Sequence, residues 1–159
     1  MSDIVAYHEA GHAFAAFYLG AIVHRVTITP DRDDGPERYG DTEIHWPRDK
    51  FDPASFTQNA VFVALAGPVA EMLYRGEPYH PGFIPEWSND WRVAWDAAEG
   101  QISEPKQRLS FLERRVVEIY QFLDETRNWA AVAALADELQ AHETLEQEEV
   151  ASVVSVWLP

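Results

Sequence analysis

The sequence contains no cysteine, and this absence excludes disulfide bonds, zinc sites built on thiolates and a cysteine nucleophile. Any metal ion would therefore be held by nitrogen and oxygen ligands. Basic residues are also few, since 12 Lys and Arg stand against 27 Asp and Glu and give a net charge of −15. That charge repels phosphate backbones and anionic lipids, so we expect no nucleic acid and no membrane surface as partners.

Long hydrophobic runs are missing as well. The longest apolar stretch, Ala60 to Leu73, is interrupted by a glycine, a proline and a glutamate, and it is shorter than the ~20 residues that span a bilayer. The N-terminus has no basic segment followed by an apolar one, which a secretory signal would need. We expect a cytoplasmic protein without membrane insertion.

The residues that are present indicate a folded body. Apolar residues make up 47% of the chain, with six Trp, eight Phe and six Tyr, which is too aromatic a composition for a disordered acidic segment. A length of 159 residues is near the common size of one domain. We therefore predict a single domain over residues 1–159.

Hydrophobic spacing and capping residues predict a mainly α fold with a small β-hairpin or sheet. Pro68 should kink or break the second helix, because proline lacks the backbone N–H. The predicted strands are His24–Thr29 and Gly40–Trp46. The predicted helices are Asp3–Leu19 (capped by Ser2), Pro53–Arg75 (between Asp52 and Gly76), Ser88 to the residue before Gly100, Pro105–Thr126, Asn128–Ala141 (capped by Asn128), and a last short helix that a Thr144/Gln147 capping box opens and that ends at Trp157.

The pattern His8-Glu9-Ala10-Gly11-His12 lies in the middle of the first predicted helix. Residues four apart share a helix face, so the two imidazoles can bind one ion, and zinc suits this pair. Glu9 is offset around the helix, where it can take a proton from water on that ion. Gly11 costs roughly 1 kcal/mol in mid-helix relative to Ala, which indicates that another segment approaches the backbone there.

Spacing alone does not identify a third ligand. Carboxylates on downstream helices and the remaining imidazoles all stay open, and each taken singly is more often a solvated side chain than a ligand. The candidates are Glu71, Asp90, Asp96, Glu99, His24, His45, His80 and His142.

Several segments resemble the peptidase domain of FtsH-type ATP-dependent zinc metalloproteases. The similar segments, in the order in which the family has them, are Ala6 to Ala13 (the zinc helix), Val23 to Pro30 (the strand after it), Ala66 to Glu71 (a Gly-Gly-Arg-x-Ala-Glu helix), Ser88-Asn89-Asp90, and Leu139 to Val150 with His142-Glu143-Thr144-Leu145. The resemblance implies an FtsH-peptidase-like fold with His8, His12 and Asp90 as ligands of one Zn2+ ion and Glu9 as general base.

The resemblance also implies a substrate strand. In the family the substrate is thought to lie as an added strand along an edge of the active site, so Gly40, Asp41, Thr42, Glu43 and Ile44 are our candidate substrate-binding residues. A plain surface hairpin is the alternative for this segment. Glu71 is expected to orient the zinc helix rather than to bind the ion.

The sequence departs from the family in carrying no P-loop pattern and no membrane anchor, and Pro68 stands where the family commonly has Gly or Arg. We expect a zinc metallopeptidase that hydrolyses peptide bonds in unfolded or flexible polypeptides without itself using ATP. A monomer and a small homo-oligomer both stay open, and a separate ATPase is a possible partner. The alternative is a peptidase-like module that binds peptides or proteins around a structural zinc ion with little turnover. A small-molecule amidohydrolase would use the same ion.

Overall fold

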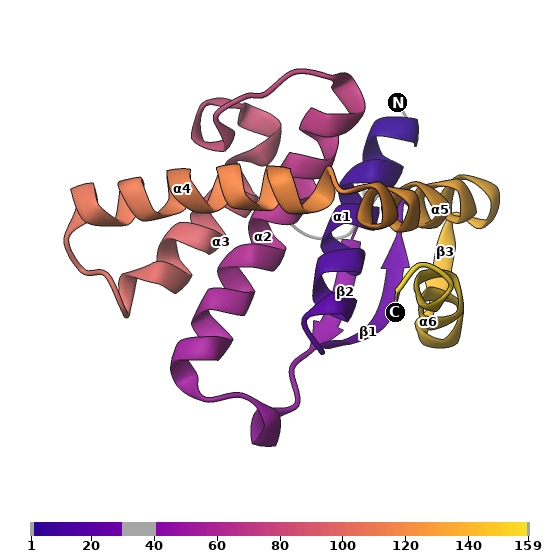
Figure 1. Cartoon of the computed structure of the whole chain (residues 1–159), viewed down its shortest axis with the longest axis horizontal. Coiled ribbons are helices and arrows are strands. Elements are labelled where there is room, and N and C mark those ends of the chain that lie inside the picture. The colour runs from indigo at the N-terminus through magenta and orange to yellow at the C-terminus, as the bar shows by residue number, and fades with distance from the viewer. Residues whose placement is uncertain (1, 30–40, 159) are drawn as a thin grey trace.

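The computed structural model describes residues 2–29 and 41–158, which form a mainly helical fold with one small sheet (Figure 1). This confirms the predicted fold class. The helices are α1 (Ser2–Tyr18), α2 (Pro53–Arg75), α3 (Ser88–Glu99), α4 (Pro105–Leu123), α5 (Thr126–His142) and α6 (Gln147–Ser155); the strands are β1 (Ile22–Thr27), β2 (Asp41–His45) and β3 (Thr144–Glu146); and single 3-10 turns cover Arg48–Lys50, Pro81–Phe83 and Pro85–Trp87.

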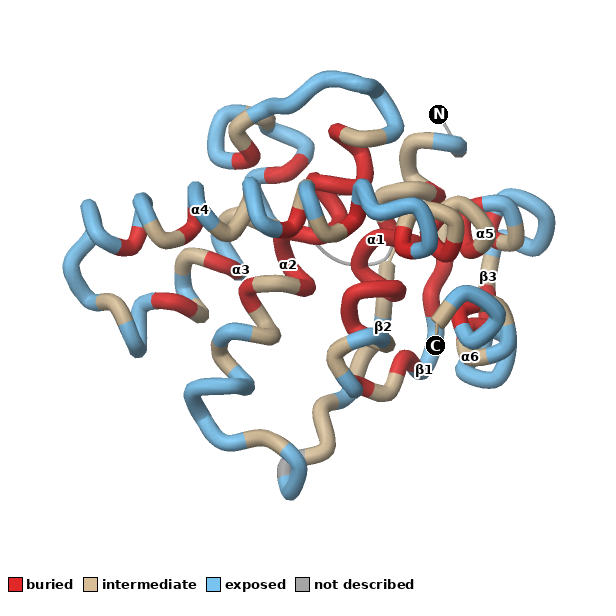
Figure 2. The backbone as a smooth tube through the Cα atoms, in the orientation of Figure 1, coloured by how far each residue is buried: buried red, intermediate tan, exposed pale blue. Residues whose placement is uncertain are grey.

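Helix α1 is the centre of the fold and packs against α2, α5 and β1. Figure 2 shows that buried residues concentrate along α1 and the part of α2 beside it. The close approach predicted at Gly11 is confirmed, because a Cβ there would lie 2.5 Å from the Ala66 carbonyl oxygen and 2.6 Å from the Ala70 Cβ. Small residues therefore let α1 and α2 meet backbone to backbone.

The sheet is antiparallel with strand order β2-β1-β3, so β2 lies at an edge of the described sheet. Both predicted strands exist. The third strand was not predicted, and the Thr144/Gln147 capping box is wrong. Thr144 instead starts β3, where its hydroxyl lies 2.8 Å from that of Thr27, and Glu146 caps α6 in a box with Glu149.

Helix α2 has the predicted ends and runs uninterrupted through Pro68. Asp52 accepts a hydrogen bond from the Ser55 amide at 2.8 Å, and Gly76 ends the helix with φ of 80°. The predicted break is wrong, because the residues from Val61 to Met72 are largely buried against neighbouring helices, and tertiary packing holds the backbone helical on both sides of the proline.

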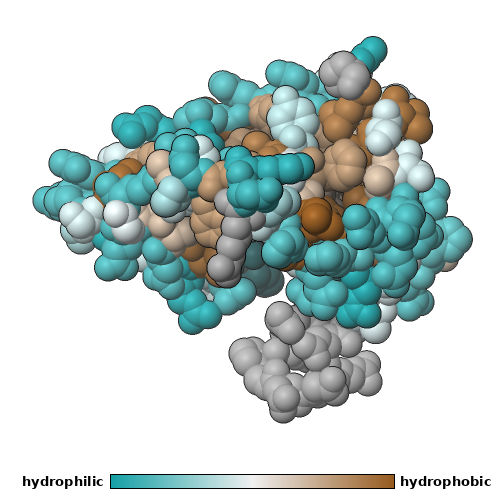
Figure 3. Space-filling view, turned by 90° about the horizontal axis from the view of Figure 1, so that it is seen from below, coloured by the Kyte–Doolittle hydropathy of each residue, from teal (hydrophilic) through white to brown (hydrophobic). Residues whose placement is uncertain are grey.

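Within the described residues, α2 alone is long and apolar enough for a membrane span by length and composition. Buried core helices meet the same test, and 61% of its apolar window is buried inside the fold. The face in Figure 3 is covered mostly by hydrophilic residues, with hydrophobic residues near its middle and toward its upper right.

Helix boundaries also differ from prediction at other places. Helix α1 already begins at Ser2, so Ser2 is not its cap, and α4 ends at Leu123. Asn128 lies inside α5, which starts at Thr126. Its buried amide donates to the carbonyl of Phe122 at 2.9 Å, so it satisfies the end of α4 instead of capping α5.

Candidate metal centre

The two histidines of the His-Glu-x-x-His pattern lie one turn apart on α1 and point to a common centre. The Nε2 atoms of His8 and His12 are 3.1 Å apart, and their rings meet edge to face with centroids 4.8 Å apart. His12 is buried and His8 is half-buried. The helical period thus does what the spacing predicts, since both imidazoles occupy one face.

Asp90 reaches the same centre from the first turn of α3. One carboxylate oxygen lies 2.9 Å from His8 Nε2, and the other lies 3.5 Å from His12 Nε2. One ligand atom from each of the three residues lies within 4.8 Å of the others. Position at a helix N-terminus favours the ionised carboxylate. The group is compact enough for all three side chains to bind a single ion.

Each histidine has an outer partner. His12 Nδ1 lies 2.7 Å from the Val63 carbonyl oxygen of α2, to which it can only donate, so in the neutral ring the lone pair of Nε2 is directed at the centre. His8 Nδ1 lies 3.7 Å from a carboxylate oxygen of buried Glu71, and the indole N–H of Trp87 donates to that same oxygen. Glu71 therefore stands behind His8 rather than at the centre.

Gly67 on α2 provides the space that His12 occupies. A Cβ at this position would lie 2.3 Å from His12 Nε2, a distance that no real contact tolerates. Sequence reasoning attached no role to Gly67 or Val63. The apolar stretch that contains them carries no signal for a metal site, because their importance depends on where α1 docks.

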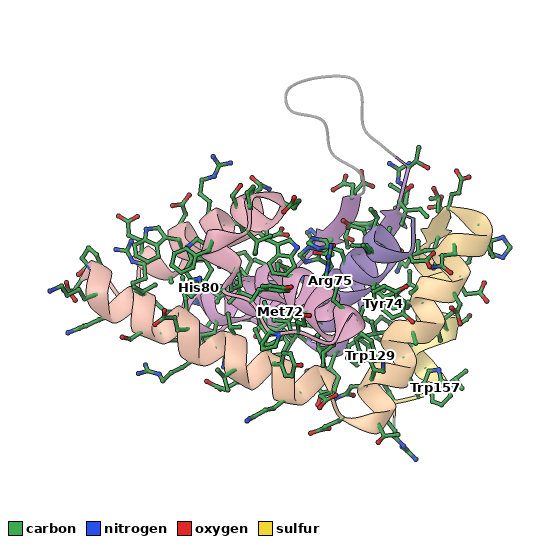
Figure 4. The ribbon with its side chains drawn as sticks, turned by 90° about the horizontal axis from the view of Figure 1, so that it is seen from above. Met72, Tyr74, Arg75, His80, Trp129 and Trp157 are labelled. Carbon is green, nitrogen blue, oxygen red and sulfur yellow. The ribbon has the colours of Figure 1, made fainter. Side chains whose placement is uncertain are left out.

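Tyr7 precedes His8 and anchors the start of α1. Its ring stacks on Tyr74 of α2 at 4.4 Å and on Trp129 of α5 at 5.3 Å between centroids. Figure 4 labels these two partners, Tyr74 and Trp129, which lie close together on neighbouring helices. The aromatic stack fixes the part of α1 that presents His8 and Glu9.

Glu9 is buried, with 7% of its surface exposed, and its main polar contact comes from the sheet. The Thr42 hydroxyl of β2 donates to Glu9 Oε1 at 2.7 Å. Of the predicted substrate-binding residues, 41–44 lie in β2 at the sheet edge, and Gly40 lies outside the described residues. The structure thus brings the predicted substrate strand to the predicted general base.

The other candidate ligands lie elsewhere among the described residues. Asp96 and Glu99 are exposed on α3. His80 pairs with Glu113 at 3.0 Å, and His142 with Glu138 at 3.4 Å. His24 and His45 are exposed on neighbouring strands with ring centroids 6.1 Å apart.

The charged groups of the cluster shift one another's pKa values. Burial lowers the pKa of His8, but the carboxylates of Asp90 and Glu71 outweigh it and raise the pKa to about 10. Burial likewise lowers the pKa of His12, and Asp90 raises it above the usual value. Burial raises the pKa of Asp90, yet the two histidines keep it well below its usual range. These shifts favour the protonated form of His8 and the ionised form of Asp90 when no metal ion is bound.

Comparisons with known proteins relate the chain to FtsH metalloproteases. No family model matches it. It is 37% identical over 107 residues to the ATP-dependent zinc metalloprotease FtsH of Thermus thermophilus, a match that covers 64% of this chain and 15% of that protein. It is 38% identical over 82 residues to FtsH of Pelobacter propionicus, which covers 46% and 12% respectively. The chain thus spans only a small part of the relatives that it matches.

Proposed function

We propose that this chain is a zinc-dependent metallopeptidase that hydrolyses peptide bonds in unfolded or flexible polypeptides. The observation that carries the proposal is the convergence of His8, His12 and Asp90 beside the buried carboxylate of Glu9. Similarity to zinc metalloproteases supports the same reaction class. We further propose that the similarity reflects a single peptidase domain over residues 1–159.

The donor set fits zinc. Two imidazole nitrogens and one carboxylate oxygen are typical ligands of catalytic zinc, which takes three protein ligands and leaves one position for water. The histidine tautomer fixed by Val63 and the carboxylate behind His8 are the outer partners that such sites use. His8, His12 and Asp90 would hold the ion, which when bound polarises a carbonyl and acidifies water.

Glu9 is the proposed general base. Its carboxylate would accept the proton of the attacking water, and the resulting carboxylic acid would return that proton to the nitrogen of the leaving amine. One water molecule is consumed, the C–N bond breaks, and the base is regenerated. Because Glu9 is buried, bulk water has little access to its carboxylate.

Strand β2 is the proposed peptide-binding element. It lies at the edge of the described sheet, and an extended peptide could pair with it through backbone hydrogen bonds that depend little on sequence. Such pairing requires a substrate whose own backbone is free, which explains the choice of unfolded or flexible polypeptides. No P-loop pattern occurs in the sequence, so ATP hydrolysis is not part of the proposal. That the chain forms a homo-oligomer, or works with a separate ATPase, stays a prediction.

The test uses the zinc-loaded protein and an unstructured, fluorescently quenched casein substrate. We expect cleavage by the parent, loss of cleavage with a chelator, recovery with added zinc, and at least a hundredfold lower rate for Glu9→Gln with unchanged zinc binding. If Glu9→Gln cleaves as fast as the parent, the mechanism is wrong. If the protein binds zinc and peptide without cleaving, it is a peptide-binding module instead.

A further inference from the structure

The contact between Thr42 and Glu9 joins two elements that lie 33 residues apart in the chain. The separation of 2.7 Å between Oγ1 and Oε1 is that of a well-formed O–H···O hydrogen bond. Because Glu9 is buried, this bond meets little competition from water. Its geometry is therefore fixed by the docking of β2 on α1.

The strand register explains why Thr42 makes this contact. Thr42 lies opposite Val26 of β1, whose side chain is fully buried, so this face of β2 is turned toward the interior. Glu43, the next residue, is on the other face, where it pairs with Arg25 at 3.6 Å in an exposed position. Alternation along the strand thus presents a hydroxyl, and no charge, to the base.

We propose that Thr42 is a positioning residue for Glu9, an inference that rests on the proposed function. A threonine hydroxyl has one proton to donate, and Oε1 at 2.7 Å is a much closer acceptor than the Glu9 carbonyl oxygen at 3.5 Å. Held by that oxygen, the carboxylate keeps Oε2 as the acceptor for the proton of the attacking water. Because Thr42 belongs to the edge strand, the element proposed to bind the peptide also orients the group that acts on it.

The test compares Thr42→Val, which removes the hydroxyl and keeps shape and β-branching, with Thr42→Ser, which keeps the hydroxyl. Thr42→Val should lower kcat about tenfold to a hundredfold while KM and zinc affinity stay within about twofold, because a misdirected base slows only the chemical step. Thr42→Ser should recover kcat to within about threefold of the parent. Thr144→Val is the matched control, since it removes a 2.8 Å hydroxyl contact at the opposite edge of the sheet and should leave kcat unchanged.

A second comparison places the effect at Glu9. In the Glu9→Gln background, Thr42→Val should cause no further loss of rate, because the two residues act as one unit. A full, additional loss in that background would overturn the inference, as would an unchanged kcat in Thr42→Val or a rise in KM alone. If circular dichroism shows that Thr42→Val does not fold, Thr42→Ala takes its place, with the same expected changes in kcat, KM and zinc affinity.

The two proposals fail separately. Activity that needs Glu9 but is indifferent to Thr42 overturns this inference and leaves the metallopeptidase standing. A zinc-loaded parent that cleaves no peptide overturns both.

Discussion

Replacing Gly67 by alanine should destroy the proposed zinc site while leaving helix α2, which contains Gly67, intact. The added Cβ would lie 2.3 Å from His12 Nε2, whereas ordinary contact begins at 3.4 Å. The ring would have to retreat by about 1.1 Å, several times the ~0.2 Å tolerance of a zinc–ligand distance. The 2.7 Å bond from His12 Nδ1 to Val63 would also have to break or bend.

The loss of zinc affinity should be large because His12, a proposed ligand of the ion, is itself displaced. Changing an outer partner of a zinc ligand costs about 10- to 100-fold in affinity, so we expect Gly67→Ala to weaken zinc binding by at least about 100-fold. Helix propensity alone would favour alanine over glycine in α2 by about 1 kcal/mol, so the substitution should not unfold the helix. A loss of zinc affinity in a folded protein would therefore come from the site.

The assay is a competition titration against a chromophoric zinc chelator, with circular dichroism to verify the fold. Gly100→Ala is the control, because Gly100 has helical φ of −64° and a Cβ there would meet nothing within 4 Å. Its zinc affinity should stay within about twofold of the parent. A folded Gly67→Ala variant that binds zinc as tightly as the parent would refute the placement of His12 against α2.

Three further predictions concern the same helices. Gly11→Ala should lower the free energy of unfolding by about 1–3 kcal/mol in urea titrations, because its Cβ would meet α2 at 2.5 Å; an unchanged midpoint would contradict this. Glu71→Gln should weaken zinc binding about tenfold in the chelator assay, because it replaces the carboxylate behind His8 by an amide. An unaltered zinc affinity would show that Glu71 only accepts the hydrogen bond from Trp87 and does not support His8. Because the pKa of His8 is raised to about 10 without metal, zinc must displace a proton from His8 at pH 7, so zinc affinity should rise with pH up to about 10. Calorimetry in buffers of different ionisation enthalpy should detect the released proton. A zinc affinity that does not depend on pH would contradict this prediction.

Local sequence rules predicted those parts of the fold that local forces determine. The i, i+4 spacing placed both histidines on one face of α1, and the caps Asp52 and Gly76 mark the ends of α2. In α4, Leu112, Ile119 and Leu123 recur at helical spacing and are fully buried. Each of these features depends on residues within one or two turns of one another.

Features that depend on docking could not be predicted in this way. The residues alone left the third ligand open among eight side chains, and only the family resemblance singled out Asp90, which the structure places 2.9 Å from His8. Thr42, Val63 and Gly67 acquire their contacts because β2 and α2 meet α1. The three-residue strand β3 was missed for the same reason, since its pairing with β1 joins segments more than a hundred residues apart.

The fold has an extensive apolar core. Fully buried apolar side chains on α1, α2, α4 and α5, such as Phe14, Leu65, Leu112 and Leu135, pack in one cluster. In the metal-free protein, Asp90 and the two histidines compensate one another's charge. Zinc should therefore stabilise an already folded chain by mass action, in proportion to RT ln(1 + [Zn]/Kd), rather than build the fold as it does in a zinc finger. We therefore expect packing, rather than the ion, to hold the three ligands in place, and a site preorganised in this way can leave one coordination position to water, as hydrolysis requires.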